Sequence, residues 1–213
     1  GHSDGLLARA GSGALTFGVP DSAGVPESVA SNTLVADYNS DQAEAYLRAY
    51  GDEIAAVIVE PIAANMGVVA PQSGFLETLR AATRATGTLL IFDEVISGFR
   101  VARGGAQARL GIEPDLTCLG KIIGGGLPVG AFGGRRDILE LLAPLGPVYQ
   151  AGTLSGNPVT MAAGHAALGL LNDAAYARLE TMGARIAEGL REALARAGIP
   201  GCVQSVASMF TMF

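Results

Sequence analysis

The sequence is poor in cysteine and histidine and has no tryptophan, and these scarcities narrow the range of metal and redox chemistry. Among 213 residues it holds two cysteines, Cys118 and Cys202, and two histidines, His2 and His165. No CxxC or HExxH spacing occurs, so we expect no metal site. Two isolated thiols are typical of a protein kept in a reducing compartment, and we expect free cysteines and a cytoplasmic location.

Positive charge and long apolar runs are scarce as well. The chain has 20 acidic and 14 basic side chains and a net charge of −6, which argues against nucleic acid as the main partner. No run of about 18 apolar residues is present, so we expect no membrane partner. With 49% hydrophobic residues and 30 glycines, the composition indicates a globular protein with a large apolar core and many tight turns.

Lysine is the scarcest of the charged residues. Lys121 is the only lysine among the 14 lysine and arginine side chains, and it lies in LGKIIGGGLPVGAFGG, residues 119–134. A guanidinium stays protonated, whereas a lysine amine that loses its proton can attack a carbonyl. A single lysine can also survive by chance, so its surroundings have to decide. The glycines that follow Lys121 allow the backbone to approach a ligand closely.

Short apolar runs alternate with amphipathic stretches along most of the chain. This alternation predicts an α/β fold with a mostly parallel sheet and helices on both of its faces. Ser73 is expected to cap one helix and Gly87 to end it. The early residues are rich in glycine, serine and proline and predict a long loop, either functional or disordered. Strands are expected at 54–61, 88–95, 115–120 and 128–134, and helices at 41–51, 73–87, 135–143, 157–172 and 175–198.

Polar and charged residues that could bind a ligand lie at the ends of three of the expected strands. Glu60 and Asn65 follow the first strand, Asp93 and Glu94 close the second, and Lys121 follows the third. Ligands of open α/β sheets bind beyond the carboxyl ends of the strands, so these residues are expected to converge. Asp93 suits either a helix cap or a charged partner for a protonated ring nitrogen. A lysine that bonds to the cofactor and an aspartate that pairs with its ring nitrogen are what proteins contribute to pyridoxal phosphate chemistry.

Four motifs in a fixed order carry a family resemblance. They are VIVEPIAANMGVV (57–69), LLIFDEVISGFR (89–100), PDLTCLGKIIGGGLPVGAFGG (114–134) and VYQAGTLSGNPV (148–159). Together they resemble the class III, fold-type I pyridoxal-phosphate-dependent aminotransferases, and among these most the glutamate-1-semialdehyde 2,1-aminomutases. The resemblance begins at Gly1 and runs to about residue 172. It weakens over 175–198 and returns at GCVQSVASMF (201–210).

The resemblance implies roles for individual residues at the cofactor ring. Lys121 matches the lysine that bonds to the cofactor, and Asp93 matches the carboxylate at the ring nitrogen. Val95 matches a side chain on one ring face, although a plain strand valine fits that position too. Asn65 matches an asparagine near the ring hydroxyl. Many class III transaminases place a glutamine directly after DEV, where this chain has Ile96, so the contact has to come from Asn65, which points to the aminomutase branch.

Two further matches concern the cofactor phosphate and the substrate. Gly152 and Thr153 match a loop that reaches the phosphate from the neighbouring subunit, which implies a homodimer; the alternative is an ordinary helix start through Ser155 and Asn157. Ser12 matches a position in a mobile active-site loop that contacts cofactor or substrate. Between two glycines, it is equally compatible with a plain turn.

The resemblance also implies a domain layout and a place in a longer protein. Residues 1–172 are expected to form part of the cofactor-binding large domain, with 1–33 as the mobile loop. Residues 173–213 are expected to form a linking helix and the start of a small C-terminal α+β domain. The chain starts with glycine and stops in the apolar run SVASMFTMF. We therefore expect it to be an internal piece of a longer protein, inactive by itself.

The implied reaction is an amino transfer within one small amino-aldehyde. (S)-4-amino-5-oxopentanoate becomes 5-aminolevulinate, with pyridoxal and pyridoxamine phosphate as the two cofactor forms. The alternatives are another class III transaminase or racemase, and a remnant that performs no chemistry. Glu60 is expected to be structural, and Arg100 is expected to be an internal ion-pair partner.

Overall fold

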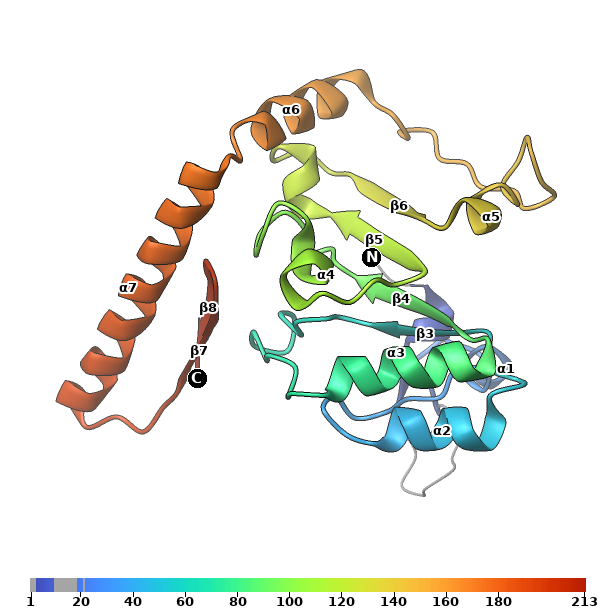
Figure 1. The fold of residues 1–213 in the computed structure, drawn as a ribbon, viewed down its shortest axis with the longest axis horizontal. Helices are drawn as coiled ribbons and strands as arrows, with labels where there is room; N and C mark the ends of the chain where they lie inside the picture. Colours follow the sequence, from blue (N-terminus) through green and yellow to red (C-terminus); the bar gives the residue numbers. More distant parts are fainter. Residues whose placement is uncertain (1–2, 10–18, 21) are drawn as a thin grey trace.

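A computed structural model describes residues 3–9, 19–20 and 22–213, and the architecture below concerns these residues. Ser12 therefore lies outside the described residues. A four-stranded sheet organises the chain, in the order β3–β4–β5–β6 (Figure 1). The first three strands run parallel and the last pairs antiparallel with β5. The strands are β3 (Ala56–Val59), β4 (Leu89–Asp93), β5 (Leu116–Gly120) and β6 (Gly130–Gly134).

Two helices, α2 (Gln42–Tyr50) and α3 (Phe75–Thr86), pack on one side of the sheet. Every second side chain of β4 points toward them, as expected for a pleated strand. Gly87 ends α3 in the left-handed conformation, as predicted, but Ser73 does not cap it: the N-cap is Gly74, with φ 87° and no side-chain bond. The apolar core between these elements consists of Leu47, Leu76, Leu79, Leu90, Phe92 and Ile112.

The second half of the chain adds four helices and a hairpin. Asn157 accepts from the N–H groups of Val159 and Thr160 at 3.0 and 3.2 Å, and so starts α6. In Figure 1, α7 descends on the left, and the β7–β8 hairpin lies between it and the sheet. These elements are α4 (Gly105–Leu110), α5 (Arg136–Leu139), α6 (Pro158–Gly169), α7 (Asp173–Ala197), β7 (Val203–Val206) and β8 (Met209–Met212).

Most of the predicted elements are present, but α4 was not predicted and two other regions differ. The helix expected at 135–143 is shorter, because α5 ends at Leu139. The early stretch, predicted as a loop, contains short regular elements in its described part, and β1 pairs antiparallel with β2. In the part of the chain that the structure describes, no helix is long and apolar enough to cross a bilayer. The early elements are η1 (Asp4–Leu6), β1 (Ala8–Arg9), β2 (Val19–Pro20) and α1 (Glu27–Ala30).

A buried ion cluster joins α3, β4 and β6 at the amino end of β5. Asp115 accepts from the N–H of Leu90 at 2.8 Å and forms ion pairs with Arg80 at 2.8 Å and Arg135 at 3.1 Å. Burial by itself would raise the pKa of Asp115. The N–H of Leu90 and the two guanidinium groups outweigh burial and hold that pKa below its ordinary value. This cluster fixes the strands at the end opposite to the candidate site.

Candidate active site

The parallel strands bring the predicted residues to one edge of the sheet. Val59 lies beside Phe92 and Asp93 lies beside Cys118, so β3 and β4 end within one residue of each other and β5 continues two residues further, to Gly120. Glu60 is the first residue after β3, Asp93 the last of β4, and Lys121 the first after β5. Residues about 30 positions apart in sequence thus meet at adjacent strand ends, as the alternating pattern predicted.

Lys121 starts the short 3-10 helix η2 (Lys121–Gly124) and has an exposed side chain. Its φ is 48°, in the left-handed region, which costs an ordinary residue about 1–3 kcal/mol and persists only where the surroundings enforce it. α6 supplies that enforcement, because it packs so closely on η2 that a Cβ on Gly164 would collide with the carbonyl oxygen of Ile123. The strain at Lys121 is typical of a functional position.

Val95 covers the backbone just before Lys121. A Cβ added to Gly120 would lie 3.2 Å from Cγ1 of Val95 and 3.3 Å from the carbonyl oxygen of Val129. Gly120 therefore permits the close approach of the valine to the lysine-bearing turn. Val95 is half-buried, which suits either a ring-stacking side chain or a packing residue.

Asp93 is half-buried and keeps part of its bonding capacity for a ligand. Its Oδ1 accepts from the N–H of Val95 at 3.0 Å, which is the local turn contact expected of a cap. Among the described residues no donor reaches Oδ2. The pKa of the Cys118 thiol is raised, by burial first and then by the Asp93 carboxylate, which shows how closely that charge lies to β5.

Glu60 holds the backbone of the loop that carries Asn65. Its Oε2 accepts from the N–H groups of Ala64 at 3.0 Å and Asn65 at 3.3 Å. Burial raises the pKa of Glu60; the two amides lower it, Asp93 raises it and Lys121 lowers it. Glu60 therefore feels the charges on both neighbouring strand ends. Sequence reasoning named Glu60 only as structural and missed this bond to Asn65, which a carboxylate five residues before the asparagine could have signalled.

Two of the predicted polar residues have different neighbours from those expected. Glu94 is buried and turned away from the site, where its carboxylate accepts from Ser97 at 3.0 Å and from the N–H of Ala106 at 2.6 Å. It anchors the start of α4. Arg100 forms no ion pair with any described residue, and its Nε donates to the carbonyl oxygen of Ile96 at 3.0 Å; the ion pair expected for Arg100 stays a prediction.

Gly152 and Thr153 lie on the exposed connection that leads into α6. Gly152 accepts from the N–H of Ser155 at 2.9 Å, and Asn157 caps α6, so the helix start expected at this place is present. Within the described chain neither Gly152 nor Thr153 bonds to a strand-end residue. Their assignment to the phosphate of a neighbouring subunit stays a prediction. Cys118 and Cys202 are free thiols, as predicted.

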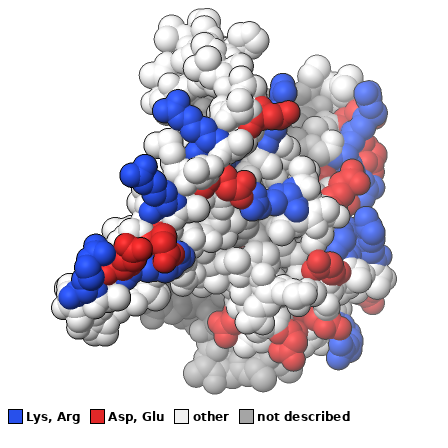
Figure 2. All heavy atoms as spheres, turned by 60° about the vertical axis from the view of Figure 1, so that its left-hand side comes forward, with Lys and Arg blue, Asp and Glu red and all other residues white. Residues whose placement is uncertain are grey.

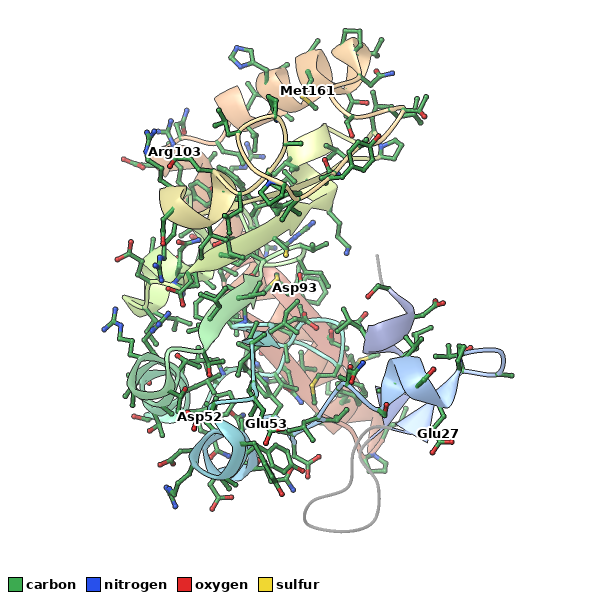
Figure 3. All side chains as sticks on the ribbon, turned by 90° about the vertical axis from the view of Figure 1, so that its right-hand side faces the viewer. Glu27, Asp52, Glu53, Asp93, Arg103 and Met161 are labelled. Carbon is green, nitrogen blue, oxygen red and sulfur yellow. The ribbon has the colours of Figure 1, made fainter. Side chains whose placement is uncertain are left out.

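The donor set suits pyridoxal phosphate. An exposed primary amine stands one strand away from a carboxylate with an unused oxygen, and an apolar side chain lies beside the amine-bearing backbone. These groups fit an aldehyde, a protonated ring nitrogen and a ring face. Figure 3 shows Asp93 near the centre of the molecule, between α2 below and α6, which carries Met161, above.

The family model of the class-III aminotransferases matches residues 1–212 of this sequence. This chain is a class-III aminotransferase family member. It is 60% identical over 215 aligned positions to glutamate-1-semialdehyde 2,1-aminomutase of Thermomicrobium roseum, an alignment that covers 100% of this chain and 50% of that protein. The chain thus spans about half the length of the curated relatives it matches.

Solved structures share this class-III fold. An omega-transaminase from Sphaerobacter thermophilus superposes with a TM-score of 0.86 and 42% identity, covering 92% of this chain and 46% of that one. A glutamate-1-semialdehyde aminomutase from Pseudomonas aeruginosa PAO1, in complex with PMP, superposes with a TM-score of 0.82 and 28% identity, covering 98% and 48%. The predicted α/β fold-type I architecture is confirmed.

Proposed function

We propose that the whole protein containing this chain converts (S)-4-amino-5-oxopentanoate to 5-aminolevulinate, a tetrapyrrole precursor, with pyridoxal and pyridoxamine phosphate as cofactor forms. The observation that carries the proposal is the placement of Lys121 one strand away from Asp93. The name of the Thermomicrobium relative, 60% identical along the entire chain, supports the choice of reaction. The PMP complex of the Pseudomonas enzyme supports the choice of cofactor.

The residues of this chain divide the work between them. When bound, the cofactor supplies an aldehyde or an amine attached to an electron-accepting ring. Lys121 provides the amine nucleophile, and its Nζ accepts and returns protons as general base and acid. Asp93 presents negative charge at Oδ2, which favours a proton on the ring nitrogen. Val95 excludes water from one face, and Asn65 donates a hydrogen bond from the loop that Glu60 holds.

A transaminase acting between two different molecules is the second candidate. The 42% identity to the Sphaerobacter omega-transaminase favours it, because the solved aminomutase is only 28% identical. Ile96 favours the aminomutase, because it stands where many class III transaminases carry a glutamine after DEV. The two reactions differ in one requirement: a transaminase consumes an external keto acid, and the aminomutase needs none.

The deciding experiment uses the protein expressed from its complete gene and loaded with pyridoxamine phosphate. It is incubated with (S)-4-amino-5-oxopentanoate in the absence of any keto acid, and 5-aminolevulinate is measured. Product formed over many turnovers supports the aminomutase. Loss of the substrate amine to an added keto acid without formation of 5-aminolevulinate, or amine transfer to pyruvate from another amine, identifies a transaminase. A protein that binds no cofactor is a remnant without this chemistry.

A homodimer is the assembly we propose for the whole protein. The connection before α6 and the start of that helix expose a run of large apolar side chains. Figure 2 shows the lobe at the top, formed by α6, free of charged residues, whereas the tip of α7 carries both signs. An apolar surface of this kind favours a partner, and a second copy would bring Thr153 to another subunit's site. The exposed residues are Leu145, Val148, Tyr149, Leu154, Val159 and Met161.

The domain layout and location are part of the same proposal. Residues 1–172 belong to the cofactor-binding large domain, and residues 173–213 form a linking helix and the start of a smaller domain. The separate hairpin β7–β8, which shares no strand pairing with the main sheet among the described residues, supports this division. Free thiols at Cys118 and Cys202 support a reducing, cytoplasmic location.

A further inference from the structure

The loop that carries Asn65, residues 61–69, holds an unfavourable backbone conformation. Ala63 and Val69 exchange two backbone hydrogen bonds of 2.9 and 3.0 Å, which close the loop on itself. At its tip Gly67 has φ 117° and Val68 has φ 59°. A positive φ is rare for a β-branched residue, and such strain persists only where neighbouring structure enforces it. The loop therefore needs support from outside.

That support comes from a segment more than 140 residues later in the chain. Met209 of β8 is 7% exposed and packs in one apolar cluster with Ile62 and Val68. The ring of Phe213 fills the space next to buried Gly67, so closely that a Cβ on Gly67 would overlap the ring. Figures 1 and 3 both place the hairpin beside the loop that follows β3.

The hairpin is fixed in turn to α7. A Cβ on Gly183 would come within 2.6 Å of the carbonyl oxygen of Ala207, so helix and hairpin turn are in close contact. Arg191 donates to the carbonyl oxygen of Val203 at 3.0 Å and to the hydroxyl of Ser205 at 3.2 Å. The position of α7 is thereby coupled to the position of the hairpin.

We propose that Met209 and Phe213 are positioning residues that set the place of Asn65 at the site. Glu60 holds the loop from the strand ends through the N–H of Asn65, and the hairpin holds its tip through Gly67 and Val68. Loosening the tip moves the Asn65 side chain while Lys121 and Asp93 stay in place. The inference rests on the proposed function, because it gives Asn65 a cofactor contact.

The test is a steric clash with a matched control, made in the protein expressed from its complete gene. Gly67→Ala places a methyl group against the Phe213 ring, whereas Gly74→Ala places one in open space at a similarly positive φ of 87°. Both variants put alanine at a positive φ, and only the first also disturbs the contact of Gly67 with the Phe213 ring, which is called the clamp below. The double variant Gly67→Ala/Phe213→Ala removes the ring and makes room for the methyl group.

Three readouts follow the loop and the site separately. Hydrogen–deuterium exchange of residues 62–69 reports on the clamp. The dissociation constant of pyridoxal phosphate reports on Asn65, and so do the separate changes in kcat and in KM. We expect faster exchange and about tenfold weaker cofactor binding for Gly67→Ala than for Gly74→Ala, since overpacking of this size costs about 1.4 kcal/mol. The double variant is expected to recover part of the cofactor affinity.

Several results would overturn the proposal. Equal exchange rates and equal cofactor affinity in Gly67→Ala and Gly74→Ala would show that the Phe213 ring does not fix the loop of residues 61–69. Faster loop exchange with unchanged cofactor binding and turnover would show that the clamp does not act on Asn65. A double variant as impaired as Gly67→Ala would exclude the steric route. If the unmodified protein makes no 5-aminolevulinate, the proposed reaction is wrong, whereas the exchange and cofactor measurements still decide the clamp.

Discussion

Asp93 and Cys118 lie opposite each other in the parallel ladder between β4 and β5, and Lys121 follows on the same chain one residue past the end of β5. This register gives the amine and the carboxylate neighbouring positions on a rigid sheet. Both side chains leave the sheet at its carboxyl edge, where α/β proteins bind ligands. The chemistry proposed for the two residues can therefore be tested at each of them separately.

Lys121→Arg in the whole protein keeps the charge and removes the nucleophile. We expect turnover to fall by at least about 10²–10⁴-fold, the range of a lost general acid–base group. Borohydride reduction of the unmodified protein with its cofactor should attach pyridoxyl to Lys121, as found by peptide mapping. A lysine introduced by Arg136→Lys into the Lys121→Arg variant, at an exposed position, should restore neither the label nor the activity. Label elsewhere in an active protein refutes the assignment.

Asp93→Asn replaces a carboxylate by a neutral group of the same shape. The amide oxygen can still accept from the N–H of Val95, so the fold should persist, but the charge proposed to face the ring nitrogen is lost. We expect turnover to fall by about 10²-fold or more, with a changed cofactor absorbance spectrum. Asp52→Asn is the control, because Asp52 is exposed and lies apart from Asp93 (Figure 3). Turnover within a few-fold of the parent would make Asp93 a turn cap only.

Variants of Glu60 distinguish its role as a hydrogen-bond acceptor from its role as a negative charge. Glu60→Gln keeps an oxygen for the N–H groups of Ala64 and Asn65, so we expect the loop and turnover to be largely retained. Burial raises the pKa of the Glu60 carboxyl, so ionising it costs stability at high pH; Glu60→Gln should gain in melting temperature relative to the parent as pH rises through that pKa.

The companion variant is Glu60→Ala, which removes the acceptor altogether. Leaving a loop amide without its acceptor costs about 1–3 kcal/mol and should weaken cofactor binding. Glu53→Ala, at an exposed position, controls for the loss of a glutamate. Equal cofactor affinity in Glu60→Ala and the parent would show that Glu60 does not hold Asn65.

Asp115→Asn breaks the buried ion cluster at the other end of the sheet. It leaves Arg80 buried without its charge partner, which costs about 3–5 kcal/mol in comparable sites. The pKa of Asp115 is depressed in the folded protein, so its stabilisation is present above the unfolded pKa of about 3.9 and is lost as pH falls further.

The difference in stability between parent and Asp115→Asn, measured by urea unfolding at each pH, should accordingly stay constant down to about pH 5 and shrink as the pH falls below about 4. Asp137→Asn is the matched control. It shares the partner Arg135 but lies at the surface, where solvent screens the pair, so little change is expected. A pH-independent difference for Asp115→Asn would mean that packing, not charge, is at stake.

Leu154→Glu tests the proposed homodimer. The side chain is 74% exposed, so a single subunit should fold normally, whereas an interface would bury the new charge. We expect the dimer dissociation constant to rise by about a hundredfold or more, seen by sedimentation velocity at several concentrations. Ile199→Glu, at the far end of α7, is the control and should leave assembly unchanged. A parent protein that is monomeric at micromolar concentration excludes the dimer.

Local pattern sufficed for the elements and for the chemistry of single residues. The strands expected at 54–61, 88–95, 115–120 and 128–134 contain β3 to β6, and the apolar pattern is clearest in β4, whose Leu90 and Phe92 are buried. The lone Lys121 and the aspartate after LLIF stood out because only an amine and a carboxylate of that kind serve a carbonyl and a ring nitrogen. Ser73 failed as a cap because a glycine beside it took the left-handed position that starts α3.

Contacts between distant residues needed the tertiary structure. Nothing near Glu94 in sequence reveals that its carboxylate accepts from the N–H groups of Ala106 and Gln107 at the start of α4. These bonds depend on backbone positions that packing decides. The same is true of Asp115, whose two arginines come from α3 and from the residue after β6.

The sequence by itself determined which groups are available and the order of strands and helices, because hydrophobic period and residue chemistry are local properties. The alternating pattern also predicted that the strand ends converge, but only the tertiary structure decided the strand register and the contacts between distant segments. Strand register set Asp93 next to β5, and packing of the β7–β8 hairpin brought Phe213 against Gly67. Such meetings depend on how apolar surfaces far apart in the chain cover one another, and no local pattern carries that information.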